Sequence, residues 1–200
     1  MTMEPDMTQK RKLTFLMFAA FLMFAIVCYW ILRRGDIHLG PKFAVVKMGV
    51  LFRSNVPTIP ALQEMERRYR IKTIVGLLND DEIKHPVFGT EQNFAKQHGI
   101  KFIHLRMGVP TPEQVTEFLE IVNNPTNQPV LVHCWHGTAR TGVLVAIYRI
   151  KEQGWSFQKS LDEMVSYGFN LESRRYKSMV DIILEYASKT ESKVAPATNY

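Results

Sequence analysis

PVLVHCWHGTARTG, residues 129–142, combines a short apolar strand, a tight loop and the start of a helix. Residues 129–133 form the uninterrupted apolar run that is typical of a strand buried on both faces of a sheet. Cys134 ends this strand, and Arg140 precedes the helix that we expect from Thr141 to Gln153. The loop is therefore predicted to lie at the carboxyl end of a parallel strand, where α/β sheets bind their ligands.

The loop between Cys134 and Arg140 has the composition of an anion site that contains a nucleophile. Its backbone N–H groups can point inward as a nest, and the helix N-terminus adds about half a positive charge. Arg140 can donate two parallel hydrogen bonds to phosphate oxygens, and Gly137 allows a backbone angle that is closed to other residues. The same positive field lowers the pKa of a thiol. One loop is thus predicted to bind a phosphoryl group and to attack it.

This segment resembles the His-Cys-x5-Arg-Thr signature of the cysteine-dependent protein tyrosine and dual-specificity phosphatases. Residues 49–54, GVLFRS, are similar to the opening motif of bacterial members of that superfamily. The helical segments after the loop are also similar, including residues 146–149, AIYR, and residues 167–169, YGF. The resemblance extends from Val45 to Leu184.

The resemblance implies a role for each residue of the signature. Cys134 would attack phosphorus and form a phosphocysteine, and Thr141 would donate to the departing thiolate in the second step. His133 would help to orient the loop and the thiolate. The phosphoryl oxygens would be held by the loop, at Trp135, His136, Gly137, Thr138, Ala139 and Arg140. Neither a metal nor an organic cofactor is required by this chemistry.

The general acid of this superfamily has no obvious counterpart here. Many members place an aspartate in the loop that corresponds to residues 106–113, but this segment contains none. Other members place it directly before the signature arginine, where this chain has Ala139. The candidates are Glu113, Asp80 and Asp81, although Glu113 also suits the first turn of a helix and the two aspartates also suit a turn. Loss of the acid would slow the reaction by roughly 10²–10⁴-fold.

Three other features have simpler interpretations. His133, Cys134 and His136 are too closely spaced for tetrahedral zinc, so no metal site is predicted. No motif for nucleic-acid binding occurs, and the arginine clusters at residues 67–70 and 174–175 read as solvated faces. Arg53 lies in a segment that the superfamily places near the site, but we expect it on the surface.

Residues 13–32, LTFLMFAAFLMFAIVCYWIL, contain no charge. Twenty helical residues span roughly 30 Å, the thickness of the hydrocarbon core of a bilayer. We interpret the run as an uncleaved transmembrane anchor rather than a signal peptide or a buried core helix. The predicted localisation is single-pass, in a plasma or bacterial inner membrane with the bilayer as a partner. Basic residues flank both ends, so the side of the catalytic domain is left open.

The remaining pattern predicts an α/β fold, with a mainly parallel central sheet flanked by helices, after one N-terminal transmembrane helix. The composition excludes a disordered chain, a collagen-like repeat and a disulfide scaffold, because 46% of residues are hydrophobic, 22% are charged and only two are cysteines. The predicted parts are a basic tail, the anchor, a phosphatase domain and a flexible tail, at residues 1–12, 13–32, 36–188 and 189–200. Within the domain, helices are expected at residues 58–68, 90–98, 141–153, 156–167 and 172–187, and a further helix is expected to begin at residue 111 and to include Val122.

The main functional hypothesis is phosphomonoester hydrolysis through a phosphocysteine, by a membrane-anchored phosphatase acting on phosphoproteins or on a phospholipid headgroup phosphate. A net charge of +6 agrees with an anionic partner. Inositol phosphates are less favoured, because the loop contains no lysine. The alternative is a catalytically inactive phosphate-binding module at the membrane. A sulfurtransferase or an arsenate reductase is a weaker third hypothesis. The oligomeric state is left open.

Overall fold

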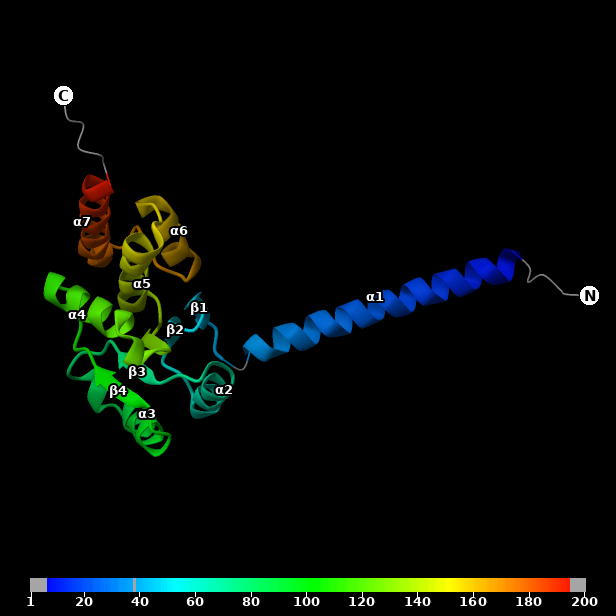
Figure 1. Cartoon of the computed structure of the whole chain (residues 1–200), viewed down its shortest axis with the longest axis horizontal. Helices are drawn as coiled ribbons and strands as arrows, with labels where there is room; N and C mark the ends of the chain where they lie inside the picture. The colour runs from blue at the N-terminus through cyan, green and yellow to red at the C-terminus, as the bar shows by residue number, and fades with distance from the viewer. Residues whose placement is uncertain (1–6, 38, 195–200) are drawn as a thin grey trace, which may run out of the picture. The chain divides into compact units, whose positions relative to one another are not determined.

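The computed structural model describes residues 7–37 and 39–194 of the chain. Contacts within the chain separate it into two units, Met1–His38 and Leu39–Tyr200, and each is described by itself (Figure 1). Residues 1–6 of the predicted basic tail and residues 195–200 of the predicted flexible tail lie outside the described residues.

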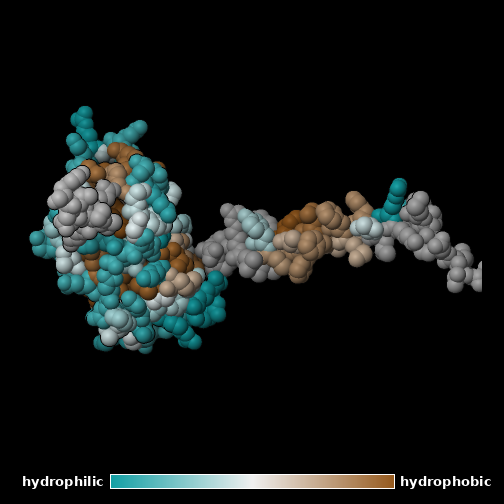
Figure 2. Space-filling view, turned by 45° about the horizontal axis from the view of Figure 1, so that its top comes forward, coloured by the Kyte–Doolittle hydropathy of each residue, from teal (hydrophilic) through white to brown (hydrophobic). Residues whose placement is uncertain are grey.

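The first unit contains one helix, α1, which spans Met7–Ile37. Its central apolar side chains, such as Phe15, Phe18 and Phe21, are exposed and form the hydrophobic stretch of this helix in Figure 2. A membrane crossing needs about 20 apolar residues in one helix. No helix in residues 7–37 or 39–194 is both long enough and apolar enough for that. The predicted membrane localisation is therefore wrong, and the structure does not support the predicted transmembrane anchor at residues 13–32 or its bilayer partner, although the run is helical.

The second unit is built on a five-stranded sheet with the order β1-β2-β5-β3-β4. Only β1 is antiparallel, and the other strands run parallel to their neighbours. The strands are β1 Ala44–Lys47, β2 Leu51–Asn55, β3 Thr73–Gly76, β4 Lys101–His104 and β5 Val130–Cys134. The predicted mainly parallel sheet is confirmed. Every residue of the central strand β5 is buried, as its apolar sequence requires.

Six helices cover the two faces of this sheet (Figure 1). One face packs against α2 and α3, the other packs against α4 and α5, and α6 and α7 pack against α5. The helices are α2 Ile59–Tyr69, α3 Pro86–Gln97, α4 Pro112–Asn123, α5 Ala139–Gln153, α6 Phe157–Ser166 and α7 Lys177–Val194. Three short 3-10 turns connect them, η1 Glu82–Lys84, η2 Pro125–Asn127 and η3 Arg174–Tyr176.

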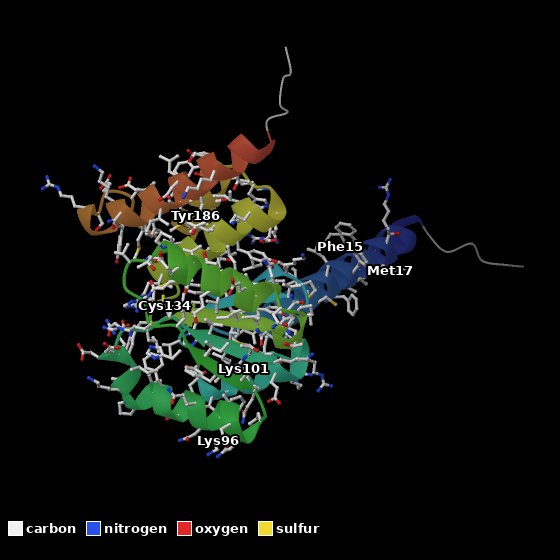
Figure 3. The ribbon with its side chains drawn as sticks, turned by 60° about the vertical axis from the view of Figure 1, so that its left-hand side comes forward. Phe15, Met17, Lys96, Lys101, Cys134 and Tyr186 are labelled. Carbon is white, nitrogen blue, oxygen red and sulfur yellow. The ribbon has the colours of Figure 1, made fainter. Side chains whose placement is uncertain are left out.

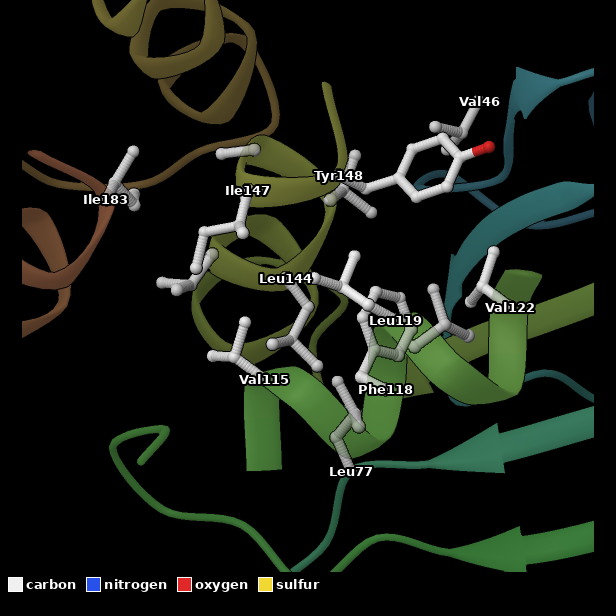
Figure 4. Packing of buried hydrophobic residues seen from close by; sticks show 14 of the residues in the cluster. Val46, Leu77, Val115, Phe118, Leu119, Val122, Leu144, Ile147, Tyr148 and Ile183 are labelled. Atoms are coloured by element: carbon white, nitrogen blue, oxygen red, sulfur yellow. The ribbon is translucent and has the colours of Figure 1, made fainter. Parts of the chain in front are cut away.

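Helix α5 is the centre of the larger core cluster. Its residues from Thr141 to Ile150 are all buried, because β5, α4, α6 and α7 surround it. Figure 4 shows Leu144 of α5 close to Val115 and Phe118 of α4, with Ile147 facing Ile183 of α7. This packing fixes the N-terminal end of α5, which is where the loop after Cys134 ends.

Two helices differ from the sequence prediction. Helix α3 begins at Pro86 rather than near Thr90, because the His85 side chain accepts from the backbone N–H of Val87 and Pro86 has no N–H that would need an acceptor. Helix α7 begins later than predicted, after η3, and continues to Val194. No glycine or proline occurs between Lys177 and Pro196, so the helix extends into the predicted flexible tail.

Candidate active site

The loop after β5 is continuous with the N-terminus of α5. Thr138 is the residue before α5, and its side chain makes no capping hydrogen bond to the helix. The first backbone N–H groups of a helix have no partner within the helix, and they favour negative charge. In Figure 3, Cys134 lies at one end of the sheet, away from Lys101 at the start of β4. The loop therefore lies at the carboxyl end of the parallel strands, in a position that is suited to an anion.

Gly137 allows the loop to lie directly against the end of β2. Its φ is +67°, and a Cβ atom at this position would be 2.5 Å from the carbonyl oxygen of Ser54. On the same side, the backbone N–H of Val56 donates to the carbonyl of Trp135 at 3.2 Å. Because a trans peptide places its C=O and N–H on opposite sides, the N–H of His136 is directed away from β2. The contact with β2 thus orients amides of the loop.

Arg53 of β2 also contacts the loop. Its side chain is fully buried, so the expectation of a surface arginine is wrong. Its Nη2 donates to the carbonyl of Gly137 at 2.7 Å. The guanidinium carbon lies 3.7 Å from the centre of the Tyr167 ring. The planar guanidinium therefore stacks on Tyr167 and donates to the loop at the same time.

The environment of Cys134 favours the thiolate, although the side chain is almost completely buried. Burial alone raises the pKa of a thiol. Hydrogen bonding from Thr141, the charge of Arg140 and the N–H of Gly137 outweigh that effect and lower the pKa of Cys134. Thr141 itself is buried in the first turn of α5. The nucleophile predicted from the sequence therefore lies in an environment that ionises it.

Arg140 is held in place by Glu82, a residue that the sequence analysis did not identify. The guanidinium donates through Nη2 to Oε1 of Glu82 at 2.7 Å and through Nη1 to Oε2. Nη1 also donates to the carbonyl of Leu77 at 2.9 Å. The hydrogen bonds from Arg140 keep the pKa of Glu82 low despite its partial burial. Glu82 directly follows Asp80 and Asp81, so its place after a buried strand was the available signal.

His133 pairs with a second buried carboxylate, Glu91 of α3. Nε2 of His133 lies 3.0 Å from Oε1 of Glu91, and both side chains are almost fully buried. Burial alone would lower the pKa of His133, but the charge and hydrogen bonding of Glu91 raise it. The Phe88 ring stacks on the histidine at 6.4 Å. The Glu91 carboxylate therefore favours the protonated form of His133, and Nδ1 of His133 lies 3.4 Å from the carbonyl oxygen of Cys134.

A cavity of about 530 Å³ opens above the loop. Its lining includes Cys134 and Arg140, together with residues from the segment after β4, from η3 and from α7. The other loop residues that line it are His136, Thr138 and Ala139. The wall residues are Asn79, Glu82, Met107, Gly108, Val109, Gly168, Tyr176 and Met179. Trp135 packs instead against the rings of His85 and Phe88.

None of the three carboxyl groups considered as general acids lines this cavity. Asp80 pairs with Arg106 at 2.7 Å, and Asp81 pairs with Lys84 at 3.4 Å, both at the surface. Glu113 lies in the first turn of α4, where its own backbone N–H and the Thr111 side chain lower its pKa. The structure therefore groups Cys134 and Arg140 at the cavity and leaves these carboxylates outside it.

A family model described as the tyrosine phosphatase family matches residues 40–198. The chain therefore belongs to this family, and the relationship inferred from the signature is confirmed.

Curated relatives and solved structures support the same family. The chain is 33% identical over 129 residues to inositol diphosphatase SIW14 of Saccharomyces cerevisiae, covering 61% of this chain and 44% of that protein. It is 30% identical over 135 residues to dual specificity protein phosphatase TpbA of Pseudomonas aeruginosa, covering 66% of this chain and 57% of TpbA. The chain thus spans about half the length of these curated relatives.

The fold is also shared with solved phosphatase domains. The crystal structure of the core catalytic domain of SIW14 with citrate has a TM-score of 0.63 and 31% identity, covering 78% of this chain and 91% of that domain. The crystal structure of TpbA has a TM-score of 0.55 and 26% identity, covering 71% and 86%.

Proposed function

We propose that this chain hydrolyses phosphomonoesters through a phosphocysteine intermediate. The observation that carries the proposal is that Cys134 and Arg140 line the same cavity. The lowered thiol pKa and the amides at the start of α5 support it. Family membership supports the same reaction class.

The reaction has two steps. In the first, the Cys134 thiolate attacks phosphorus, an S–P bond forms, and the leaving oxygen departs with its electron pair and takes up a proton. Arg140 and the loop amides stabilise the charge on the other phosphoryl oxygens. In the second, water attacks phosphorus, the S–P bond breaks, and the thiolate returns to its hydrogen bond with Thr141. Inorganic phosphate is the product, and His133 keeps the base of the loop in place.

For the substrate we favour a phosphorylated protein. The similarity to TpbA, a dual specificity protein phosphatase, supports this class and also supports a bacterial-type member. A phospholipid headgroup phosphate was the second class inferred from the sequence, but its argument depended on an anchor that the structure does not bear out. SIW14 is an inositol diphosphatase. The loop here contains no lysine to meet several phosphates, so we place that class last.

The direct test replaces the nucleophile. Cys134→Ser is expected to abolish phosphate release from para-nitrophenyl phosphate, because an alcohol does not ionise at neutral pH. Cys28→Ser, in α1, is the matched control and should retain the wild-type rate. Equal rates for Cys134→Ser and the wild type would contradict the proposal.

A catalytically inactive phosphate-binding module is the second candidate. Ala139 at the position before Arg140, and the three carboxylates outside the cavity, favour it. Rapid quench of the wild-type protein with a radiolabelled aryl phosphate separates the two. A labelled phosphocysteine would support the enzyme, whereas stable binding of phosphate without label on Cys134 would support the module.

A further inference from the structure

Protonation of the leaving oxygen needs a donor inside the cavity. A general acid must come within hydrogen-bonding reach of the atom that it protonates. Besides Cys134, the titratable side chains that line the cavity are Glu82, His136, Arg140 and Tyr176. The donor can therefore be sought among these four.

Glu82 is not available as a proton donor. Oε1 accepts from Arg140, and Oε2 accepts from Arg140 and from the backbone N–H of Asn79 at 2.9 Å. These donors hold the pKa of Glu82 low, so the group is a carboxylate at neutral pH. Its two oxygens act as acceptors that orient Arg140.

Arg140 and Tyr176 are also poorly suited. An arginine keeps its proton throughout the physiological range, and tyrosines as a class titrate near 10. The Tyr176 ring packs on Phe169 with ring centres 5.1 Å apart, which makes it part of the wall. A donor works best when its pKa lies near the operating pH, and histidines as a class meet that condition.

His136 is exposed at the rim of the cavity, two residues after the nucleophile. Its ring makes no hydrogen bond to any residue in the described part of the chain, so it is free to meet a ligand. The charge of His136 contributes to the lowered pKa of Glu82, which places the ring within electrostatic reach of the carboxylate that holds Arg140. The ring, the guanidinium and the thiol therefore face one space.

We propose that His136 is the general acid of this site, in place of the aspartate that the loop lacks. The inference rests on the proposed phosphatase function. As the bond between phosphorus and the leaving oxygen breaks, the protonated imidazole gives its proton to that oxygen and becomes neutral. In the second step, the neutral imidazole takes a proton from the attacking water while the S–P bond breaks. The ring thus returns to its starting state.

The dependence on the leaving group distinguishes this role from a structural one. An unactivated phenolate needs a proton as it departs, whereas dinitrophenolate departs as a stable anion. Loss of the acid should therefore slow the hydrolysis of phenyl phosphate by roughly 10²-fold or more, and it should leave the rate with dinitrophenyl phosphate nearly unchanged. A residue that only shaped the loop would affect both substrates equally.

The experiment compares full-length wild type, His136→Ala and His98→Ala on these two substrates. His98 lies at the end of α3 and does not line the cavity, so its variant controls for loss of an exposed histidine. Free imidazole is then added to His136→Ala. We expect a selective loss with phenyl phosphate, and recovery of part of that rate with imidazole.

An equal loss on both substrates without rescue, or no loss on either, would overturn the role of His136. Those outcomes leave the phosphatase itself intact, because the wild type still turns over both substrates. If the wild type shows no turnover that depends on Cys134, the proposed function fails first and this inference fails with it.

Discussion

The residues of the signature could be predicted because they are contiguous in the sequence. Cys134 and Arg140 are six positions apart and belong to one strand, loop and helix start, so local chemistry was sufficient to identify them. Glu82 and Arg53 contact the same loop across 58 and 84 positions, respectively. Their roles depend on β2 and β3 lying beside β5, which no local pattern encodes. Arg53 was expected at the surface because an isolated arginine is usually solvated.

The Glu82–Arg140 pair gives a prediction at this scale. In Glu82→Gln, the guanidinium loses a charge-assisted, bidentate partner and keeps its hydrogen bond to Leu77. We expect kcat to fall about tenfold, in line with the loss of one to two hydrogen bonds to a charged group. KM should change little, because two effects on phosphate binding cancel. Removal of the negative charge of Glu82 strengthens binding, and the less firmly held guanidinium of Arg140 weakens it.

Steady-state kinetics on para-nitrophenyl phosphate measures this effect. Asp81→Asn is the matched control, since Asp81 is exposed, pairs with Lys84 at the surface and does not line the cavity. A higher kcat in Glu82→Gln would show that Glu82 competes with the substrate for Arg140 instead of orienting it.

At the scale of elements, the sheet and the helix pattern were predictable, and the boundaries were not. The apolar runs identified the strands, and Thr111 with Pro112 identified the start of α4, where Thr111 and Gln114 form a capping box. The start of α3 depends on the unusual cap at His85, for which no strong sequence signal exists. The turn η1, which carries Glu82, is only three residues long and has no periodicity to detect.

The contact between the loop and β2 predicts the effect of a small change at Gly137. Gly137→Ala would require a positive φ for alanine and would place its Cβ 2.5 Å from a backbone oxygen of β2. We expect the free energy of unfolding to fall by about 1–3 kcal/mol, and turnover to fall with it as the amides shift. Gly89→Ala is the control in α3, where a Cβ would meet no atom within 4 Å.

Denaturant unfolding and turnover should be measured on both glycine variants. Gly89→Ala should be neutral or more stable by up to about 1 kcal/mol, because alanine favours a helix interior. A Gly137→Ala protein with wild-type stability and rate would mean that the loop does not depend on its close approach to β2.

For the whole molecule, all residues that build the site belong to the second unit. The cavity lining extends from Asn79 to Met179, and the supporting Arg53 and Glu91 also lie within Leu39–Tyr200. The smaller core cluster begins with Leu39, and the larger one begins with Val46. A chain that begins at Leu39 should therefore fold and should keep the wild-type kcat and KM on a small aryl phosphate. Leu39 is fully buried, so starting the chain beyond it would remove part of the core.

This truncation is tested by comparing both lengths of chain in thermal unfolding and in turnover, each with and without Cys134→Ser. The Cys134→Ser forms measure the background, so that a small residual rate in either length can be assigned to the site. Equal values of kcat and KM for the two lengths would assign the chemistry to the unit that the family model covers, residues 40–198. A lower kcat with unchanged unfolding would instead mean that residues before Leu39 contribute to catalysis, since the core and its stability would be intact.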